Sequence, residues 1–260
     1  MTLLVVDRLN KRFGGVFAAR DVSFTLAAGE MLAIIGPNGA GKSTTFNMVG
    51  GQLKPDSGSI TLDGQAITGR PARAVWRCGV GRTFQVAQTF VSMSVAENVQ
   101  MALVSRHGES RRLFADTRRL HREAALALLA EVGMRAEADR PVSELAYGDV
   151  KRVELAVALA SQPKLLLMDE PTAGMAPRER GGLMTLTARL ARERGIGVLY
   201  TEHDMEAVFG HADRVMVLVR GEIIAAGSPD HVRGDARVRQ VYLGEAGTAA
   251  ALKARRKAVA

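Results

Sequence analysis

A glycine-rich segment at residues 36–43 constrains the fold of this chain more than any other part of the sequence. It reads Gly-Pro-Asn-Gly-Ala-Gly-Lys-Ser and fits G-x-x-x-x-G-K-[ST], in which glycines let backbone N–H groups approach a polyphosphate. The unbroken apolar run Met31–Ile35 before it is typical of a strand buried on both faces. Lys42–Val49 can begin a helix, whose N-terminus favours an anion. The segment therefore predicts a strand, loop and helix that bind a nucleoside triphosphate.

The last residues of this motif have specific chemical roles. Lys42 would neutralise the β and γ phosphates, and the Ser43 hydroxyl would ligate Mg²⁺. Further contacts to the nucleotide are expected from the rest of the loop and the first helical turn, namely from Gly36, Asn38, Gly39, Ala40, Gly41 and Thr44.

Acidic side chains follow a second apolar strand, at residues 164–168. Open α/β sheets bind their ligands at the C-terminal ends of strands. Asp169 would hold Mg²⁺ directly or through its water, and Glu170 would orient or deprotonate the attacking water. Gln85, at another strand end, can ligate Mg²⁺ or the water through its amide oxygen. His203, after a further strand, could donate to the γ phosphate.

The remaining pattern predicts an α/β core with one helical block. The 260 residues, 47% of them apolar, are enough for one large α/β domain or two small ones. A helix is expected at residues 177–193, with proline in its first turn. Strands are expected at residues 3–26 (two, joined by a turn at Gly14-Gly15), 59–63, 79–84 and 197–201, and a hairpin at 213–219 and 222–226. No internal repeat is present.

Helical periodicity dominates from residue 94 to about residue 132. Ser94 is a plausible N-cap of the first helix of this block. A longer helix is expected at residues 117–132, with its apolar side at Leu120, Ala124, Leu128 and Val132. We interpret residues 92–160 as a helical subdomain inserted in an α/β domain of residues 1–245. The alanine-rich, basic residues 246–260 are expected to be a poorly ordered tail.

Composition places the chain in a reducing compartment. Cys78 is the only cysteine, which excludes an internal disulfide. No run of about eighteen apolar residues could span a bilayer, and the apolar stretch at the start is too short for a secretory signal. We therefore expect a cytoplasmic protein.

The net charge of +8 admits three interpretations, namely a solvated surface, proximity to anionic lipid, and nucleic-acid binding. The basic clusters contain no interleaved aromatic residues of the kind that stack on single-stranded bases. We favour the solvated surface, then the membrane, and expect no nucleic acid. The clusters comprise Arg106, Arg111, Arg112, Arg118, Arg119 and Arg122, and Lys253, Arg255, Arg256 and Lys257.

Taken together, these features resemble the ATP-binding subunit of ABC transporters, from the first strand to Leu243-Gly244-Glu245. The resemblance implies a P-loop NTPase fold of the ABC type, with an N-terminal antiparallel β subdomain and an inserted helical subdomain. It also implies that the chain hydrolyses ATP. The matching elements are Phe13 (adenine-stacking aromatic), residues 36–43 (Walker A), Gln85 (Q-loop), Asp169 and Glu170 (Walker B) and His203 (switch histidine).

A finer resemblance is to the branched-chain amino-acid importers, which carry two different ATP-binding subunits. It rests on residues 81–85 (Gly-Arg-Thr-Phe-Gln), 145–149 (Leu-Ala-Tyr-Gly-Asp) and 241–245 (Val-Tyr-Leu-Gly-Glu). Membership implies a second ATP-binding subunit, identical or not, two membrane permease subunits and, indirectly, an external solute-binding protein. It implies a location at the cytoplasmic face of the membrane.

The signature element departs from the family's common Leu-Ser-Gly-Gly-Gln. In the family this element binds the γ phosphate of the nucleotide on the opposite subunit. Here Ala146 lacks the serine hydroxyl, and Tyr147 replaces a glycine, while Gly148 is retained. Asp149 could cap the following helix. We expect one weakened and one ordinary composite site. Ala176 also stands where the loop after Walker B usually has an acidic residue.

The transported solute stays open at this level. Transporters with ATP-binding subunits similar to this chain carry branched-chain amino acids, but also amides, urea and other organic acids. The alternative to a transport function is an ABC ATPase that acts in regulation or together with nucleic acid.

Overall fold

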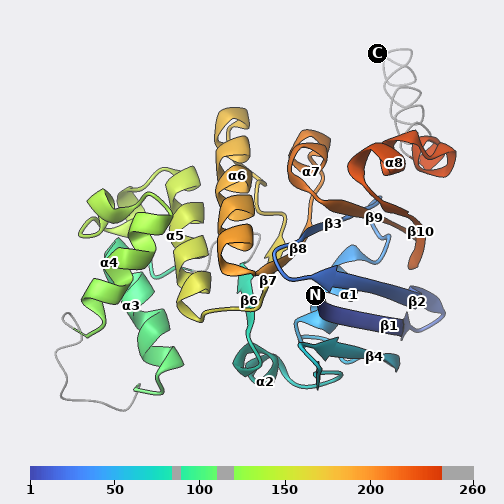
Figure 1. Ribbon diagram of the computed structural model, residues 1–260, viewed down its shortest axis with the longest axis horizontal. Helices are drawn as coiled ribbons and strands as arrows, with labels where there is room; N and C mark the ends of the chain where they lie inside the picture. Colours follow the sequence, from blue (N-terminus) through green and yellow to red (C-terminus); the bar gives the residue numbers. More distant parts are fainter. Residues whose placement is uncertain (84–88, 110–119, 242–260) are drawn as a thin grey trace, which may run out of the picture.

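The computed structural model describes residues 1–83, 89–109 and 120–241, and Figure 1 shows their arrangement. The site is built on a six-stranded sheet with strand order β10-β9-β3-β8-β7-β6. The central strand β3 pairs in parallel with β8 and β9, and β7 pairs in parallel with β8 and β6. The strands are β3 (Met31–Ile35), β6 (Val80–Thr83), β7 (Leu165–Asp169), β8 (Gly197–Thr201), β9 (Arg214–Val219) and β10 (Glu222–Gly227). The strands expected before the phosphate loop and before the acidic pair are confirmed.

A second, antiparallel sheet packs beside the first, with strand order β2-β1-β4-β5. Its long strands β1 and β2 are joined by the expected turn, in which Gly14 has a φ of 56°. The bounds are β1 (Thr2–Phe13), β2 (Val16–Ala27), β4 (Ser57–Leu62) and β5 (Gln65–Ala66). The expected antiparallel β region at the N-terminal end of the chain is confirmed.

Strand β3 serves two hydrophobic cores at once, because successive side chains of a strand point to opposite faces. Met31, Ala33 and Ile35 belong to the core that the helical region and α6 cover. Leu32 and Ile34 belong to the core shared with the antiparallel sheet and α1. All five side chains are buried. This double burial explains the unbroken apolar run and holds the end of the strand in a fixed place.

Eight α-helices lie in the described part of the chain. Helices α3, α4 and α5 pack on one another and lie apart from the antiparallel sheet, beyond α6 (Figure 1). None of the described helices has the length and hydropathy needed to cross a membrane. They are α1 (Lys42–Val49), α2 (Ala72–Arg77), α3 (Val95–Arg106), α4 (Arg122–Glu131), α5 (Tyr147–Ala160), α6 (Pro177–Arg194), α7 (Met205–His211) and α8 (Pro229–Gly234), with short 3₁₀ turns at Arg135–Glu137 and Val142–Glu144.

The predicted start of the helical block is confirmed. The apolar side predicted for the second helix is confirmed at Leu128 and Val132, which are buried, but it is wrong at Ala124. Ser94 caps α3 in a capping box with Glu97. Helix α4 buries Ala125, Leu128 and Leu129, whereas Ala124 is exposed. A strict spacing of four residues drifts away from a helix of 3.6 residues per turn, so the buried stripe also needs spacings of three. The bounds 92–160 for an inserted subdomain and 1–245 for the domain stay predictions, and residues 246–260 lie outside the described part.

Candidate active site

The phosphate loop connects the end of β3 to α1 in a conformation that only glycine can adopt at two positions. Gly36 has a φ of 151°, and a Cβ there would lie 2.1 Å from the carbonyl oxygen of Leu218. Gly41 has a φ of 102°, and a Cβ there would lie 2.1 Å from the carbonyl oxygen of Ala18. Both neighbours are backbone atoms, which cannot turn aside. The neighbouring strands therefore enforce the motif's first and last glycines.

The loop encloses a cavity of about 320 Å³ beneath two catalytic candidates. The Lys42 ammonium donates hydrogen bonds to the carbonyl oxygens of Gly36, at 2.6 Å, and Pro37, at 3.2 Å. Glu170 and His203, more than 120 residues further along the chain, belong to the same lining. The full lining is Ala18, Asn38, Gly39, Ala40, Gly41, Lys42, Ser43, Thr44, Glu170 and His203. The structure thus brings most of the predicted loop residues together with the predicted base and the switch histidine.

The acidic pair at the end of β7 is held by Thr201, the last residue of β8. The Thr201 hydroxyl donates to Asp169 Oδ1 at 2.8 Å, and the Glu170 N–H donates to the Thr201 carbonyl oxygen at 3.1 Å. Glu170 has a φ of 47°, in the left-handed region that non-glycine residues rarely occupy. Glu170 Oε1 lies 2.9 Å from His203 Nε2. The two side chains therefore meet across the cavity.

Arg82 on β6 contacts Asp169 from the other side, and sequence reasoning gave it no role. Its Nη2 lies 3.4 Å from Asp169 Oδ2, and its Nη1 donates to Asn47 Oδ1 at 2.9 Å. The guanidinium lies 4.9 Å from the ring centroid of Phe46. Burial lowers the pKa of Arg82, and the charge of Asp169 opposes that shift. The sequence signal for this contact was a charged residue in a short strand whose other residues are uncharged.

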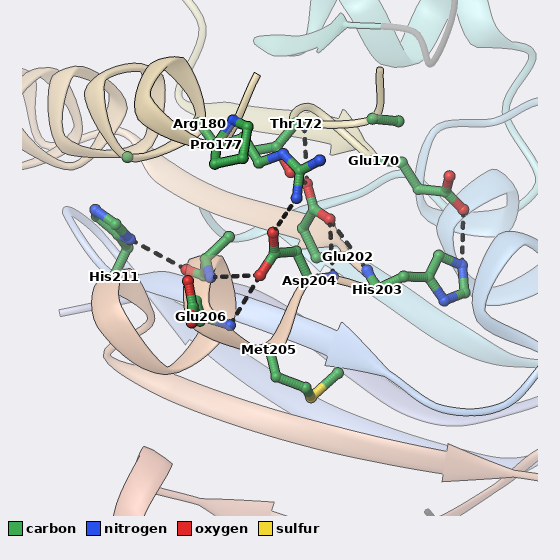
Figure 2. A pocket seen from close by; sticks show the side chains of 13 residues that line it. Glu170, Thr172, Pro177, Arg180, Glu202, His203, Asp204, Met205, Glu206 and His211 are labelled. Carbon is green, nitrogen blue, oxygen red and sulfur yellow. Dashed lines mark hydrogen bonds and ion pairs between the residues drawn. The ribbon is translucent and has the colours of Figure 1, made fainter. Parts of the chain in front are cut away.

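Beyond His203, a second cavity of about 850 Å³ opens between α6 and α7 (Figure 2). Asp204 caps α7 by accepting hydrogen bonds from the N–H groups of Glu206 and Ala207. The hydrogen bond from Arg180 holds the pKa of Asp204 below its usual value. Glu202 and Thr172 form the inner wall of this cavity and hydrogen bond to each other. The loops after β7 and β8 are therefore linked on this side too.

The signature-like residues do not line the phosphate-loop cavity of their own chain. Ala146 is the N-cap of α5 and provides no side-chain hydrogen bond, so the expectation that Asp149 caps this helix is wrong. Asp149 lies in the first turn instead, because the helix begins at Tyr147. Tyr147 is 41% exposed, and a Cβ on Gly148 would lie 3.0 Å from a carboxylate oxygen of Glu179.

Two further site predictions lie elsewhere. Phe13, at the end of β1, is 52% exposed and lies outside the lining of the phosphate-loop cavity. The Lys11 ammonium lies 5.7 Å from its ring centroid. Gln85 lies outside the described residues.

Comparison with known proteins gives two family matches. The pattern of the family described as "ABC transporter" matches residues 19–173. The pattern described as "Branched-chain amino acid ATP-binding cassette transporter" matches residues 222–248. The first covers more than half of the chain.

Curated relatives match the chain over most of its length. It is 41% identical over 254 residues to the high-affinity branched-chain amino acid transport ATP-binding protein LivG of Salmonella typhimurium, covering 94% of this chain and 98% of that protein. It is 39% identical over 243 residues to the lipopolysaccharide export system ATP-binding protein LptB of Acidithiobacillus ferridurans, covering 94% of this chain and 97% of that protein.

Solved structures share the fold. An ABC transporter ATP-binding cassette in its ADP conformation is 30% identical, with a TM-score of 0.84, covering 94% of this chain and 99% of that one. A dimeric ATP-binding cassette in a post-hydrolysis state, bound to ADP and Pi, is 25% identical, with a TM-score of 0.72, covering 87% and 99%. Family pattern, relatives and fold agree with the geometry of the phosphate loop, and the chain belongs to the ABC transporter family as a nucleotide-binding ATPase.

Proposed function

We propose that this chain binds and hydrolyses MgATP and thereby powers a membrane importer of branched-chain or related amino acids. The observation that carries the catalytic part is the single cavity in which the phosphate loop, Glu170 and His203 meet. ATP would lie with its phosphates on the loop amides and on Lys42, which now donates to two loop carbonyl oxygens. Phe13 would stack on the adenine from the end of β1.

A magnesium ion fits the donor set beside the loop. Mg²⁺ in phosphate-binding sites is held by one or two protein oxygen ligands together with phosphates and water. The exposed Ser43 hydroxyl and the half-buried Asp169 carboxylate offer such oxygens, and Gln85 would add its amide oxygen. When bound, the ion neutralises charge on the phosphates. Thr201 and Arg82 would hold Asp169 in place for it.

Glu170 and His203 would carry out the chemistry on the γ phosphate. Glu170 would accept the proton of the attacking water, or orient that water, as a general base. His203 would donate a hydrogen bond to the γ-phosphate oxygens. The 2.9 Å contact between the two side chains supports this, because it places both at the opening of the loop cavity.

A second ATP-binding subunit would complete the nucleotide site. The residues Ala146, Tyr147 and Gly148 of this chain would face the nucleotide held by that partner. Ala146 provides no hydroxyl, and the carboxylates of Asp149 and Glu179 lie close to this helix start. Negative charge there repels a phosphate. We therefore propose that the partner's nucleotide site is the weaker of the two.

The membrane permease would dock in a groove of about 890 Å³ between α2 and β6 on one side and α3 and α5 on the other. Its lining is partly apolar, with Trp76, Ala102 and Val157, and it includes Arg82, which also contacts Asp169. A permease segment in this groove would therefore contact Arg82, which itself contacts Asp169, the proposed Mg²⁺ ligand. The chain would then sit peripherally on the cytoplasmic face of the membrane.

The solute is inferred from the relatives. LivG and LptB have similar identities to this chain, so identity alone favours import of branched-chain amino acids only slightly over lipopolysaccharide export. The match at residues 222–248 supports branched-chain amino acids as the solute, because the description of that family names them. Amides, urea and organic acids stay possible solutes of the same proposal. Stimulation of ATP hydrolysis by nucleic acid would instead support an ABC ATPase that acts on nucleic acid.

The catalytic proposal is tested with Glu170→Gln in the complex with the second ATPase. This variant should bind ATP with unchanged affinity in calorimetry and lose more than about a hundredfold in turnover, since a base contributes 10²–10⁴. Glu193→Gln is the matched control, because Glu193 pairs with Arg189 at the far end of α6. Wild-type turnover in Glu170→Gln would exclude Glu170 as the base. Uptake of leucine by vesicles with the assembled transporter tests the solute, and export or no uptake would refute that part.

A further inference from the structure

The inner wall of the cavity in Figure 2 is formed by one buried carboxylate that joins two loops. Glu202 follows β8 and is 3% exposed. Its Oε1 accepts hydrogen bonds from the Thr172 N–H, at 2.8 Å, and the Thr172 hydroxyl, at 2.6 Å. Its Oε2 accepts hydrogen bonds from the N–H groups of His203, at 3.0 Å, and Asp204, at 3.4 Å. One oxygen thus binds the loop after β7, and the other binds the loop after β8.

Both loops carry a residue of the proposed reaction. Thr172 lies two residues after Glu170, and Glu202 immediately precedes His203. We propose that Glu202 is a positioning residue that fixes Glu170 against His203 by clamping the two loops together. This inference rests on the proposed function, since it assigns Glu202 to the ATPase reaction of that site.

Physical chemistry makes this clamp specific to a carboxylate. A buried charge is tolerated only when it is well hydrogen bonded, and hydrogen bonds to a charged acceptor are stronger than those between neutral groups. Glutamine has the same shape, but its NH₂ group would face N–H donors in one of the two loops. Glu202→Gln therefore keeps one half of the clamp and loses the other.

The clamp is separate from the parts that hold the nucleotide. Glu202 and Thr172 do not line the phosphate-loop cavity, in which the phosphate loop and the first turn of α1 form most of the lining. Loosening the two loops should therefore reduce kcat and leave ATP affinity unchanged. A misplacement of about 1 Å in reacting groups lowers rates by around a hundredfold, so losses of ten- to a hundredfold are expected.

The test compares the kcat of variants at Thr172 and Glu202, measured in the complex with the second ATPase. Thr172→Val removes the hydroxyl donor, and Thr172→Ser retains it and should restore most of kcat. In the double variant Glu202→Gln/Thr172→Val, kcat should fall by less than the product of the two single losses, because both changes loosen the same link between the two loops. Thr185→Val is the matched control, since the Thr185 hydroxyl on α6 lies 3.2 Å from His211 Nε2 and is not a hydrogen-bond donor to Glu202.

A second readout needs no nucleotide. The amides of Thr172, His203 and Asp204 donate to Glu202, so Glu202→Gln should make hydrogen exchange about tenfold faster at the amides of the loop that it releases, whereas exchange in α1 stays unchanged. Additive losses in the double variant, equal losses in Thr172→Ser and Thr172→Val, or unchanged exchange would overturn the clamp. An inactive wild-type complex would instead refute the proposed function, since the exchange result does not depend on it.

Discussion

Tyr200, at the centre of the six-stranded sheet, is fully buried on β8 beside the clamp. Its hydroxyl has no hydrogen-bond partner among the described residues. Burial, with the charge of Glu202 as a smaller cause, raises the pKa of this phenol far above its usual value. The hydroxyl therefore stays protonated and unsatisfied, which is unfavourable in a protein interior.

We expect Tyr200→Phe to leave the free energy of unfolding unchanged or to raise it by about 1 kcal/mol, because it removes an unsatisfied polar group and keeps the ring. Urea denaturation of the two proteins measures this difference. The comparison with Tyr200→Leu, which also removes the ring and should destabilise, separates the hydroxyl from the packing. A loss of stability in Tyr200→Phe would mean that the hydroxyl has a partner.

Site residues that belong to a local sequence motif could be predicted from the sequence. A loop motif and two polar strand ends predicted Lys42, Glu170 and His203 as site residues, and the structure brings them to one cavity, while their catalytic roles stay predictions. Arg82 and Glu202 could not be predicted in this way, because their roles come from residues that other strands bring close. Glu202 meets Thr172 across 30 residues of sequence, and no local pattern encodes that pairing.

At the scale of elements, the entrance to α3 shows how a cap fixes a boundary. The Ser94 side chain accepts a hydrogen bond from the Glu97 N–H at 3.2 Å, and the Glu97 carboxylate accepts one from the Ser94 N–H at 2.8 Å. These bonds satisfy two of the amide groups that a helix start leaves without partners.

We expect Ser94→Ala to lower the free energy of unfolding by about 1 kcal/mol, the usual cost of losing an N-cap. Ser94→Asp keeps an acceptor at the cap and should retain most of the stability. Chemical denaturation of the three proteins provides the measurement. Equal stability of Ser94→Ala and the wild type would show that the capping box adds nothing here.

The sequence predicted the bounds of elements that a local motif sets. It did not predict fully which residues of an alanine-rich helix are buried. β3 and α1 have the expected bounds, because the phosphate motif starts at Gly36 and the strand before it is buried on both faces. The prediction placed Ala124 on the buried side of α4 wrongly, because several alanines of this helix could face the core equally well. Packing against α3 and α5 decides between Ala124 and Ala125.

At the scale of the whole molecule, the phosphate loop and the signature-like helix start lie in different parts of the fold. The loop opens onto α1 beside the two sheets, whereas Tyr147 begins α5 in the helical region beyond α6 (Figure 1). In this fold, residues 146–148 therefore cannot contact a nucleotide that is bound to the phosphate loop of the same chain. A solved relative of the fold is a dimer bound to ADP and Pi. The arrangement and this relative both favour nucleotide sites shared between two chains.

If the partner is a different ATP-binding subunit, the two shared sites are unequal and can be told apart. We expect Lys42→Ala in this chain to lower the turnover of the complex tenfold or more, because removing a preorganised phosphate donor typically costs 10²–10³ at the affected site. Replacing the corresponding lysine of the partner should have a much smaller effect, since in the proposed dimer that nucleotide would face Ala146 and the carboxylates near Gly148. Steady-state ATPase rates of the two single-variant complexes make the comparison, with calorimetry to count the bound nucleotides. Equal losses would show that the altered signature supports hydrolysis as well as the common one, and a larger loss from the partner's lysine would reverse the assignment of the sites.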